Sequence, residues 1–214
     1  MRNYIILVLI SFIGSSVLYL YKAPGATEVY QSPETIQSYK NQYALGCSPN
    51  LSAINFSDSA NIIPLLEGWG KHRMPVTVTN DSAAIYFQQG INMYYGFHII
   101  EALASFEKAV QFDESFAMGH WGKALAYGPN INDFGYAASP EALAAVQKAS
   151  ELCSNCTPVE KALIAAMQTR YSTDTTQTRV YLNELYAAAM KEVHKNFPQS
   201  GDAAALYADA LMVQ

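Results

Sequence analysis

The sequence is poor in charged residues, and it has no basic cluster. Charged side chains make up 14% of the 214 residues, 13 basic against 18 acidic, and no basic run exceeds two residues. The formal net charge is −5. Nucleic-acid binding needs a clustered footprint of Lys and Arg on the phosphates. The composition therefore argues against a nucleic-acid partner.

Cysteine is scarce, and its spacing supports few chemistries. The chain contains Cys47 and a Cys-x-x-Cys pair, Cys153 and Cys156. This spacing occurs in redox and zinc sites, but no second Cys/His pair accompanies it at metal-ligand spacing, and no His follows directly, as haem attachment requires. A disulfide between Cys153 and Cys156 is the first interpretation. Free structural thiols and a catalytic or metal role are the alternatives.

Familiar catalytic motifs are missing as well. The sequence has no Ser-His-Asp spacing, no nucleophile elbow and no Gly-rich phosphate loop. We therefore expect a protein that is not an enzyme and needs no cofactor. An alternative is a metal-binding or sensing module: His98 and Glu101 lie three residues apart on a predicted helix, and His120 on the next helix could approach them as a third ligand. The competing interpretation is that each histidine satisfies a local backbone or tyrosine group.

The chain does contain one long apolar segment near its start. Residues 4–21 carry no charge and are followed by Lys22. Eighteen helical residues reach roughly 27 Å, close to the hydrocarbon thickness of a bilayer. We expect residues 1–26 to be an N-terminal transmembrane anchor, with a cleaved signal peptide as the alternative. Both interpretations put the rest of the chain on the outer side of the cell membrane or in the periplasm.

The next region, residues 27–80, reads as one short helix followed by an irregular covering loop. Ser32, Pro33 and Glu34 are typical of a helix start. The stretch after Leu45 is rich in Ser, Asn and Pro and includes apolar residues and Trp69. Those side chains favour burial, so we expect the loop to cover the first helix pair.

An internal repeat organises residues 81–214. The segment EALASFEKA (101–109) returns as EALAAVQKA (141–149), with six of nine positions identical. Repeats of this length indicate stacked supersecondary units. Tyr86, Gly90, Ala102, Phe106 and Ala109 follow the aromatic–Gly–Ala–Phe–Ala skeleton of a tetratricopeptide (TPR) unit. The sequence predicts an all-α, TPR-like solenoid of antiparallel helix pairs.

Helix start and stop signals divide this domain into units. Units are expected at about 81–113, 114–153 and 157–196, with a final helix at 202–214. The third begins with a capping box at Thr157 to Glu160, and its first helix is expected to reach about Tyr171. Its second helix is expected to begin near Asp174 and to end before Pro198. The second contains an insertion at residues 128–135. Since the last helix has no polar cap, which terminal units of solenoids require, we expect further helices beyond Gln214 in a longer protein, and the active site of such a protein could lie there.

The predicted function is protein binding through the concave surface of the repeats. The first helix of each pair lines that surface in a TPR, and an exposed aromatic stripe on it would bind a peptide or a helix. The alternative is that the stripe is core. Two asparagines of the inserted loop could bind backbone groups or merely stabilise a turn. The candidate groove consists of Phe87, Ile91, Tyr94, Tyr95, Trp121, Leu125, Asn130 and Asn132.

Four segments in a fixed order also resemble a group of exported bacterial tetratricopeptide-repeat proteins. The resemblance covers about residues 62–214 and implies the fold and the compartment more than a mechanism. It also implies that the chain continues past Gln214. The family tends to have several histidines after a Gly-x-Gly motif, which is Gly68 to Gly70 here, whereas this chain has only His72 at that place. The family's histidine at the start of the next helix also comes one residue later than His98. The matching segments are residues 68–78, 86–90, 96–110 and 120–132.

Overall fold

The computed structural model describes residues 60–61, 63–131 and 140–213. The chain divides into compact units between Gln31 and Ser32, and all described residues belong to the second. The predicted membrane or signal segment, the short helix at Ser32 and Cys47 lie outside the described residues. Among those described, no helix is both long and apolar enough to span a bilayer.

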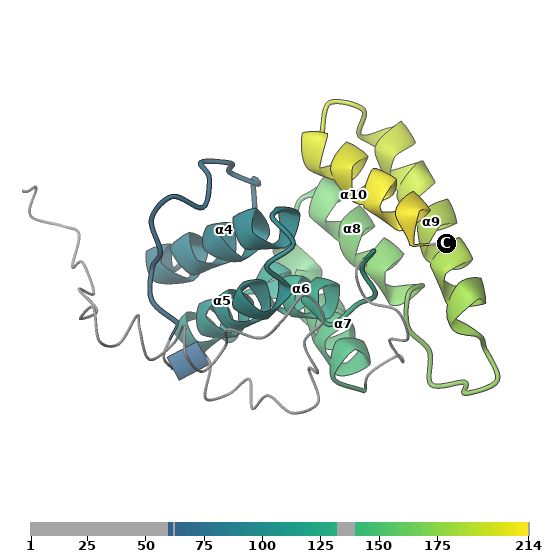
Figure 1. The fold of residues 1–214 in the computed structure, drawn as a ribbon, viewed down its shortest axis with the longest axis horizontal. Helices are drawn as coiled ribbons and strands as arrows, with labels where there is room; N and C mark the ends of the chain where they lie inside the picture. Colours follow the sequence, from purple (N-terminus) through teal and green to yellow (C-terminus); the bar gives the residue numbers. More distant parts are fainter. Residues whose placement is uncertain (1–59, 62, 132–139, 214) are drawn as a thin grey trace, which may run out of the picture. The chain divides into compact units, whose positions relative to one another are not determined.

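The described part of the domain is all-α and contains seven α-helices packed in sequential pairs (Figure 1). Helix α4 packs on α5, α6 on α7, and α8 on α9, while α10 returns along α9. Contacts also join α4 to α6 and α6 to α8, so the first helices of successive pairs lie beside one another. The helices are α4 (Asp81–Tyr95), α5 (Ile99–Phe112), α6 (Ala117–Ala126), α7 (Pro140–Leu152), α8 (Pro158–Gln168), α9 (Arg179–Asn196) and α10 (Gly201–Met212).

Local capping sets several helix starts where the sequence predicts them. The Asn80 side chain accepts hydrogen bonds from the backbone N–H groups of Ser82 and Ala83, which begins α4. The predicted capping box is confirmed: the Thr157 hydroxyl accepts from the Glu160 N–H, and the Glu160 carboxylate accepts from the Thr157 N–H. Each such cap satisfies helix donors that have no partner inside the helix.

The boundaries between α8 and α9 differ from the prediction. We expected α8 to reach Tyr171 and α9 to begin near Asp174. Helix α8 ends at Gln168, because the Thr169 hydroxyl and the Arg170 N–H bond to carbonyls three residues back. The Asp174 carboxylate instead accepts from the N–H of Thr176 and forms a turn, so α9 starts only after its cap residue Thr178.

Phe106 lies at the centre of the first three helices and is fully buried. Its ring fits between Gly90 on α4 and Gly122 on α6. A β-carbon at Gly90 would lie 2.6 Å from Phe106 Cε1, and one at Gly122 would lie 2.5 Å from Phe106 Cδ1. The two glycines therefore let α4 and α6 approach the same ring from opposite sides.

Candidate functional site

Most of the predicted groove is core. Phe87, Ile91, Trp121 and Leu125 are fully buried, and Tyr94 is 5% exposed. The expectation that these five side chains are exposed is wrong. The physical reason is packing against neighbouring elements: the Trp121 indole N–H donates to the Leu163 carbonyl of α8 at 3.3 Å. Tyr95 and Asn130 are partly buried, and Asn132 lies outside the described residues.

Hydrogen bonds from the last turn of α4 reach across to α10. The Tyr94 hydroxyl donates to Asp209 Oδ2 at 3.1 Å, and the Tyr95 hydroxyl donates to Asp202 Oδ1 at 2.9 Å. His72 Nε2 also lies 2.7 Å from Asp202 Oδ1. Burial first, and the adjacent carboxylate second, raise the pKa of both tyrosines. Both hydroxyls therefore stay protonated and act as donors.

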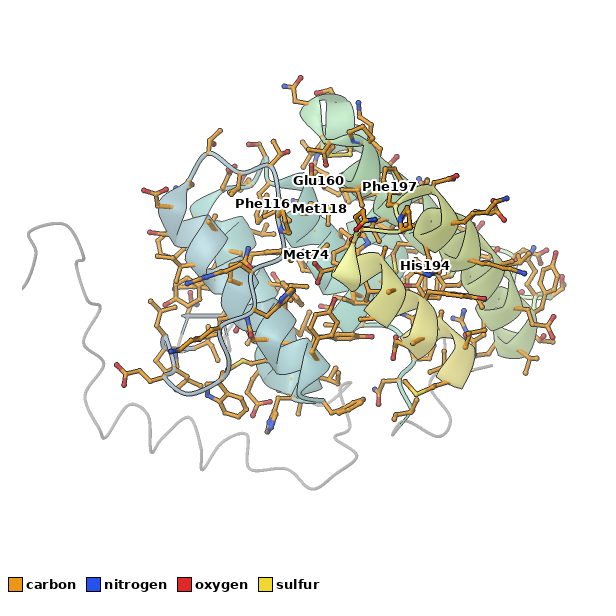
Figure 2. All side chains as sticks on the ribbon, turned by 90° about the horizontal axis from the view of Figure 1, so that it is seen from above. Met74, Phe116, Met118, Glu160, His194 and Phe197 are labelled. Atoms are coloured by element: carbon orange, nitrogen blue, oxygen red, sulfur yellow. A yellow bond between two sulfur atoms is a disulfide. The ribbon has the colours of Figure 1, made fainter. Side chains whose placement is uncertain are left out.

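Residues 63–78, here called the strap, run along α4 without regular secondary structure. This described part of the predicted covering loop lies on α4, the first helix of its pair. Ile63 and Met74 of the strap are buried, and Met74 belongs to the same core cluster as Phe116 and Met118 (Figure 2). The strap is therefore part of the core as well as a cover.

Three side-chain amides of α4 hold the strap by its backbone. Gln88 pairs with both the N–H and the carbonyl of Met74, at 2.9 and 2.8 Å. Asn92 does the same with His72, at 3.2 and 3.0 Å. Gln89 accepts from the Leu66 N–H and donates to the Pro64 carbonyl. The amides thus supply the partners that a neighbouring strand would otherwise give to an extended backbone.

Next to these amides the surface is hollowed. The hollow has a volume of about 180 Å³. Leu65, Trp69, Arg73 and Ile85 form part of its wall, and the three amide-bearing residues of α4 form another part. Leu65 and Ile85 are 40% and 45% exposed. Two large apolar side chains therefore meet solvent at one concave place.

The turn between α4 and α5 carries an exposed aromatic residue in a strained conformation. Phe97 has φ 61° and is 49% exposed. The Phe97 N–H bonds to the Tyr94 carbonyl, and the His98 N–H bonds to the Met93 carbonyl. This is the Schellman pattern, whose left-handed position usually holds glycine. Here Gly96 comes one residue too early and has φ −87°, so Phe97 adopts the left-handed conformation.

The histidines proposed as metal ligands serve other contacts. His98 is the residue at the N-cap position of α5, and its ring packs edge-on to Trp69 at 4.3 Å instead of capping the helix. His120 Nε2 lies 3.0 Å from the Glu114 carbonyl oxygen, and burial lowers its pKa. Over the described residues, which include Glu101, no three His, Cys, Asp or Glu side chains are grouped as ligands for a metal ion. The alternative in which His98, Glu101 and His120 form one ligand set is therefore not supported by the described residues.

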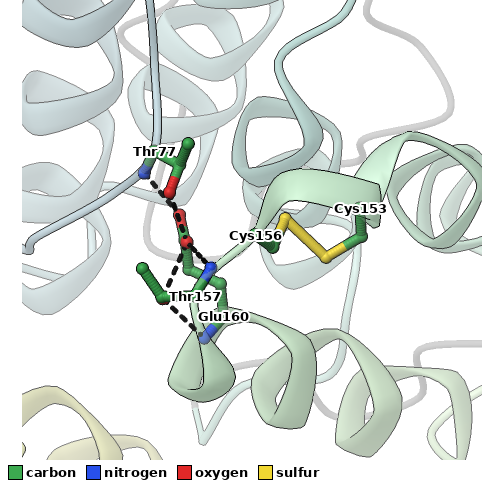
Figure 3. Close-up of a disulfide and its surroundings, with 5 residues drawn as sticks. All are labelled: Thr77, Cys153, Cys156, Thr157 and Glu160. Atoms are coloured by element: carbon green, nitrogen blue, oxygen red, sulfur yellow. Dashed lines mark hydrogen bonds between the residues drawn. A yellow bond between two sulfur atoms is a disulfide. The ribbon is translucent and has the colours of Figure 1, made fainter.

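Cys153 and Cys156 are joined by a disulfide directly before α8 (Figure 3). Beside it, the fully buried Glu160 carboxylate accepts from the backbone N–H and the hydroxyl of Thr77 and from the N–H of Thr157. The same side chain therefore caps α8 and fixes the far end of the strap.

Sequence reasoning missed the three amides that hold the strap, and it missed a buried arginine. Arg170 has no exposed surface, lies over the Tyr186 ring at 4.5 Å and donates to the Pro129 carbonyl. The polar residues at positions 88, 89 and 92 lie on a helix that is otherwise apolar on two faces. This pattern could have indicated the amides that hold the strap. Arg170 gave no such signal, because its position follows a helix end that the sequence did not reveal.

No protein family, curated protein or solved structure in the comparisons matches this chain.

Proposed function

We propose that this protein is a non-catalytic, TPR-like scaffold that binds a protein partner outside the cytoplasm. The repeated EALA segments and the sequential helix pairs support the repeat architecture. The apolar segment at residues 4–21 supports membrane attachment or export.

One observation carries the binding role: apolar side chains are exposed where α9 and α10 meet. Five large residues there are 37% to 59% exposed. The start of α9 and the end of α10 lie together, because the Asn183 side-chain amide donates to the Val213 carbonyl. Clustered apolar surface of this kind marks interaction sites in soluble domains. The residues are Val180, Tyr181, Leu185, Leu211 and Met212.

The test is cross-linking capture from native membranes with the full chain and a Tyr181→Glu variant. Lys191→Glu is the matched control, because it adds the same side chain at another exposed position of α9. We expect one defined protein to be captured by the wild type and the control and to be lost with Tyr181→Glu, while circular dichroism shows unchanged helices. Equal capture by both variants, or no defined protein with the wild type, would contradict the proposal.

A further inference from the structure

The hollow beside the strap is too small for a cofactor or a drug-sized ligand. Pockets for such molecules usually measure roughly 300 to 1,000 Å³, against about 180 Å³ here. A cavity of this size, open to solvent and bordered by Leu65 and Ile85, accommodates a single side chain. Its shape and size therefore indicate an anchor pocket on a protein surface.

The three amide side chains in the wall of the hollow are engaged with the strap. Gln88 and Asn92 use both ends of their amides on the strap backbone. Gln89 accepts from Leu66 and donates to Pro64 and to the Ser105 hydroxyl. A polar anchor would compete with these hydrogen bonds, whereas an apolar anchor would leave them in place. The hollow therefore selects an apolar side chain.

The rim adds a preference for negative charge. Arg73 lines the hollow, is exposed, and makes no ion pair with any described residue. Lys71 lies two residues away and is exposed too, while Glu67 is the acidic residue on this part of the strap. A guanidinium that has no ion-pair partner among the described residues and lies beside an apolar hollow is complementary to a carboxylate next to an apolar group.

Phe97 is close to this surface along the chain and has a strained backbone conformation. It follows Gly96 and precedes His98, whose ring packs on Trp69 at the wall of the hollow. A bulky residue at positive φ is an outlier, and strain of this kind persists mainly at functional sites. About half of the Phe97 surface remains exposed, so the ring is available for a contact with a partner.

We propose that the hollow, with Arg73 on its rim and Phe97 beside it, is the docking site for an acidic protein segment that inserts one apolar side chain. The carboxylate of the segment lies within one or two residues of the apolar anchor and pairs with Arg73. Phe97 packs against the segment on the Trp69 side. The proposal rests on the scaffold function and adds a second binding surface, separate from the α9–α10 end, with a partner of stated chemistry.

The experiment is a selection of displayed random linear peptides on the full chain in detergent, followed by affinity measurement. We expect the selected peptides to share an apolar residue next to Asp or Glu. Binding should weaken about tenfold or more in Ile85→Glu, the scale of a lost interface anchor. Lys191→Glu, which puts the same side chain at an exposed position of α9 outside both proposed binding surfaces, should bind as the wild type does.

Two further variants separate recognition from folding. Arg73→Glu should lose the acidic peptides and regain binding when the peptide carboxylate is replaced by Lys. Phe97→Gly should raise the melting temperature yet weaken peptide binding, a combination that a purely structural role would not produce. The proposal is overturned if no peptide is enriched, or if enriched peptides bind Ile85→Glu and Arg73→Glu as well as the wild type. A partner captured through the α9–α10 end would in that case leave the scaffold function standing without the hollow.

Discussion

Replacing Gly122 by Ala tests whether the Phe106 ring sets the spacing of the first three helices. In a helix interior this change normally stabilises by about 1 kcal/mol, because Ala loses less backbone entropy than Gly on folding. Here the new methyl group would lie 2.5 to 2.8 Å from three carbons of the Phe106 ring. The ring cannot move away freely, since its other side lies equally close to Gly90.

The steric cost of the added methyl group is expected to exceed the stabilisation from helix propensity. Overpacking of a well-packed core costs about 1 to 3 kcal/mol, and this site belongs at the upper end because both sides of the ring are blocked. After the propensity gain, Gly122→Ala should lower the free energy of unfolding by about 1 to 2 kcal/mol. Urea unfolding followed by circular dichroism measures the difference.

A double-mutant cycle and a matched control make the test specific. Phe106→Leu removes the ring atoms that the methyl group meets, so the double variant should be more stable than the two single effects predict, by about 1 kcal/mol or more. Gly201→Ala is the control, because Gly201 is also helical and has nothing within 4 Å of its added β-carbon. If Gly122→Ala is as stable as Gly201→Ala, or if the cycle shows no coupling, the ring does not set the helix spacing.

Three other changes have expected outcomes. Phe97→Gly should raise the free energy of unfolding by about 1 kcal/mol, measured by urea unfolding, because it removes a left-handed bulky residue; a loss of stability would refute the strain. Glu160→Gln should lower the same quantity by about 2 kcal/mol, since an amide cannot accept all the hydrogen bonds that Thr77 and Thr157 donate; Glu151→Gln, on the exposed end of α7, is its control and should change little. Burial raises the pKa of Asp209 above its ordinary 3.8, against the opposing effects of Arg170 and the Tyr94 hydroxyl. The folded state then holds this proton more tightly than the unfolded state, so the contribution of Asp209 to stability is largest below pH 3.8 and falls as the pH rises through the raised pKa. In unfolding curves at several pH values, Asp209→Asn should lack this decline, and parallel pH profiles of the variant and the wild type would contradict it.

Local signals explain why the helices could be predicted from the sequence. Asn80, the Thr157 capping box and Pro198 act on their own helix ends, and their effects do not depend on the rest of the fold. Gly90 and Phe106 were predicted only as positions of the repeat skeleton, and the structure adds that they lie in close contact.

The candidate groove could not be predicted in the same way, because exposure depends on what covers a surface. Tyr94 lies on a helix face that either solvent or another element could occupy, and only the tertiary structure brings Asp209 to it. The strap has no periodicity, so its path along α4 follows from amide contacts that are distant in sequence. Phe97 was missed because glycine usually takes the left-handed position at a helix end, and Gly96 directly precedes it. The hydrogen-bond pattern instead places the left-handed residue one position later, at Phe97.

The hydrogen bonds between α4 and α10 also affect how the domain should unfold. In a simple helical array each unit touches only its neighbours, so the ends can fray independently and stability adds up along the chain. Here Tyr94 and Asp209 are 115 residues apart in sequence, and His72 and Asp202 are 130 apart. These contacts raise the contact order, which slows folding. They also mean that the last helix cannot separate from the first pair without breaking bonds there, so the amides of α10 should exchange with solvent on the same time scale as those of α4.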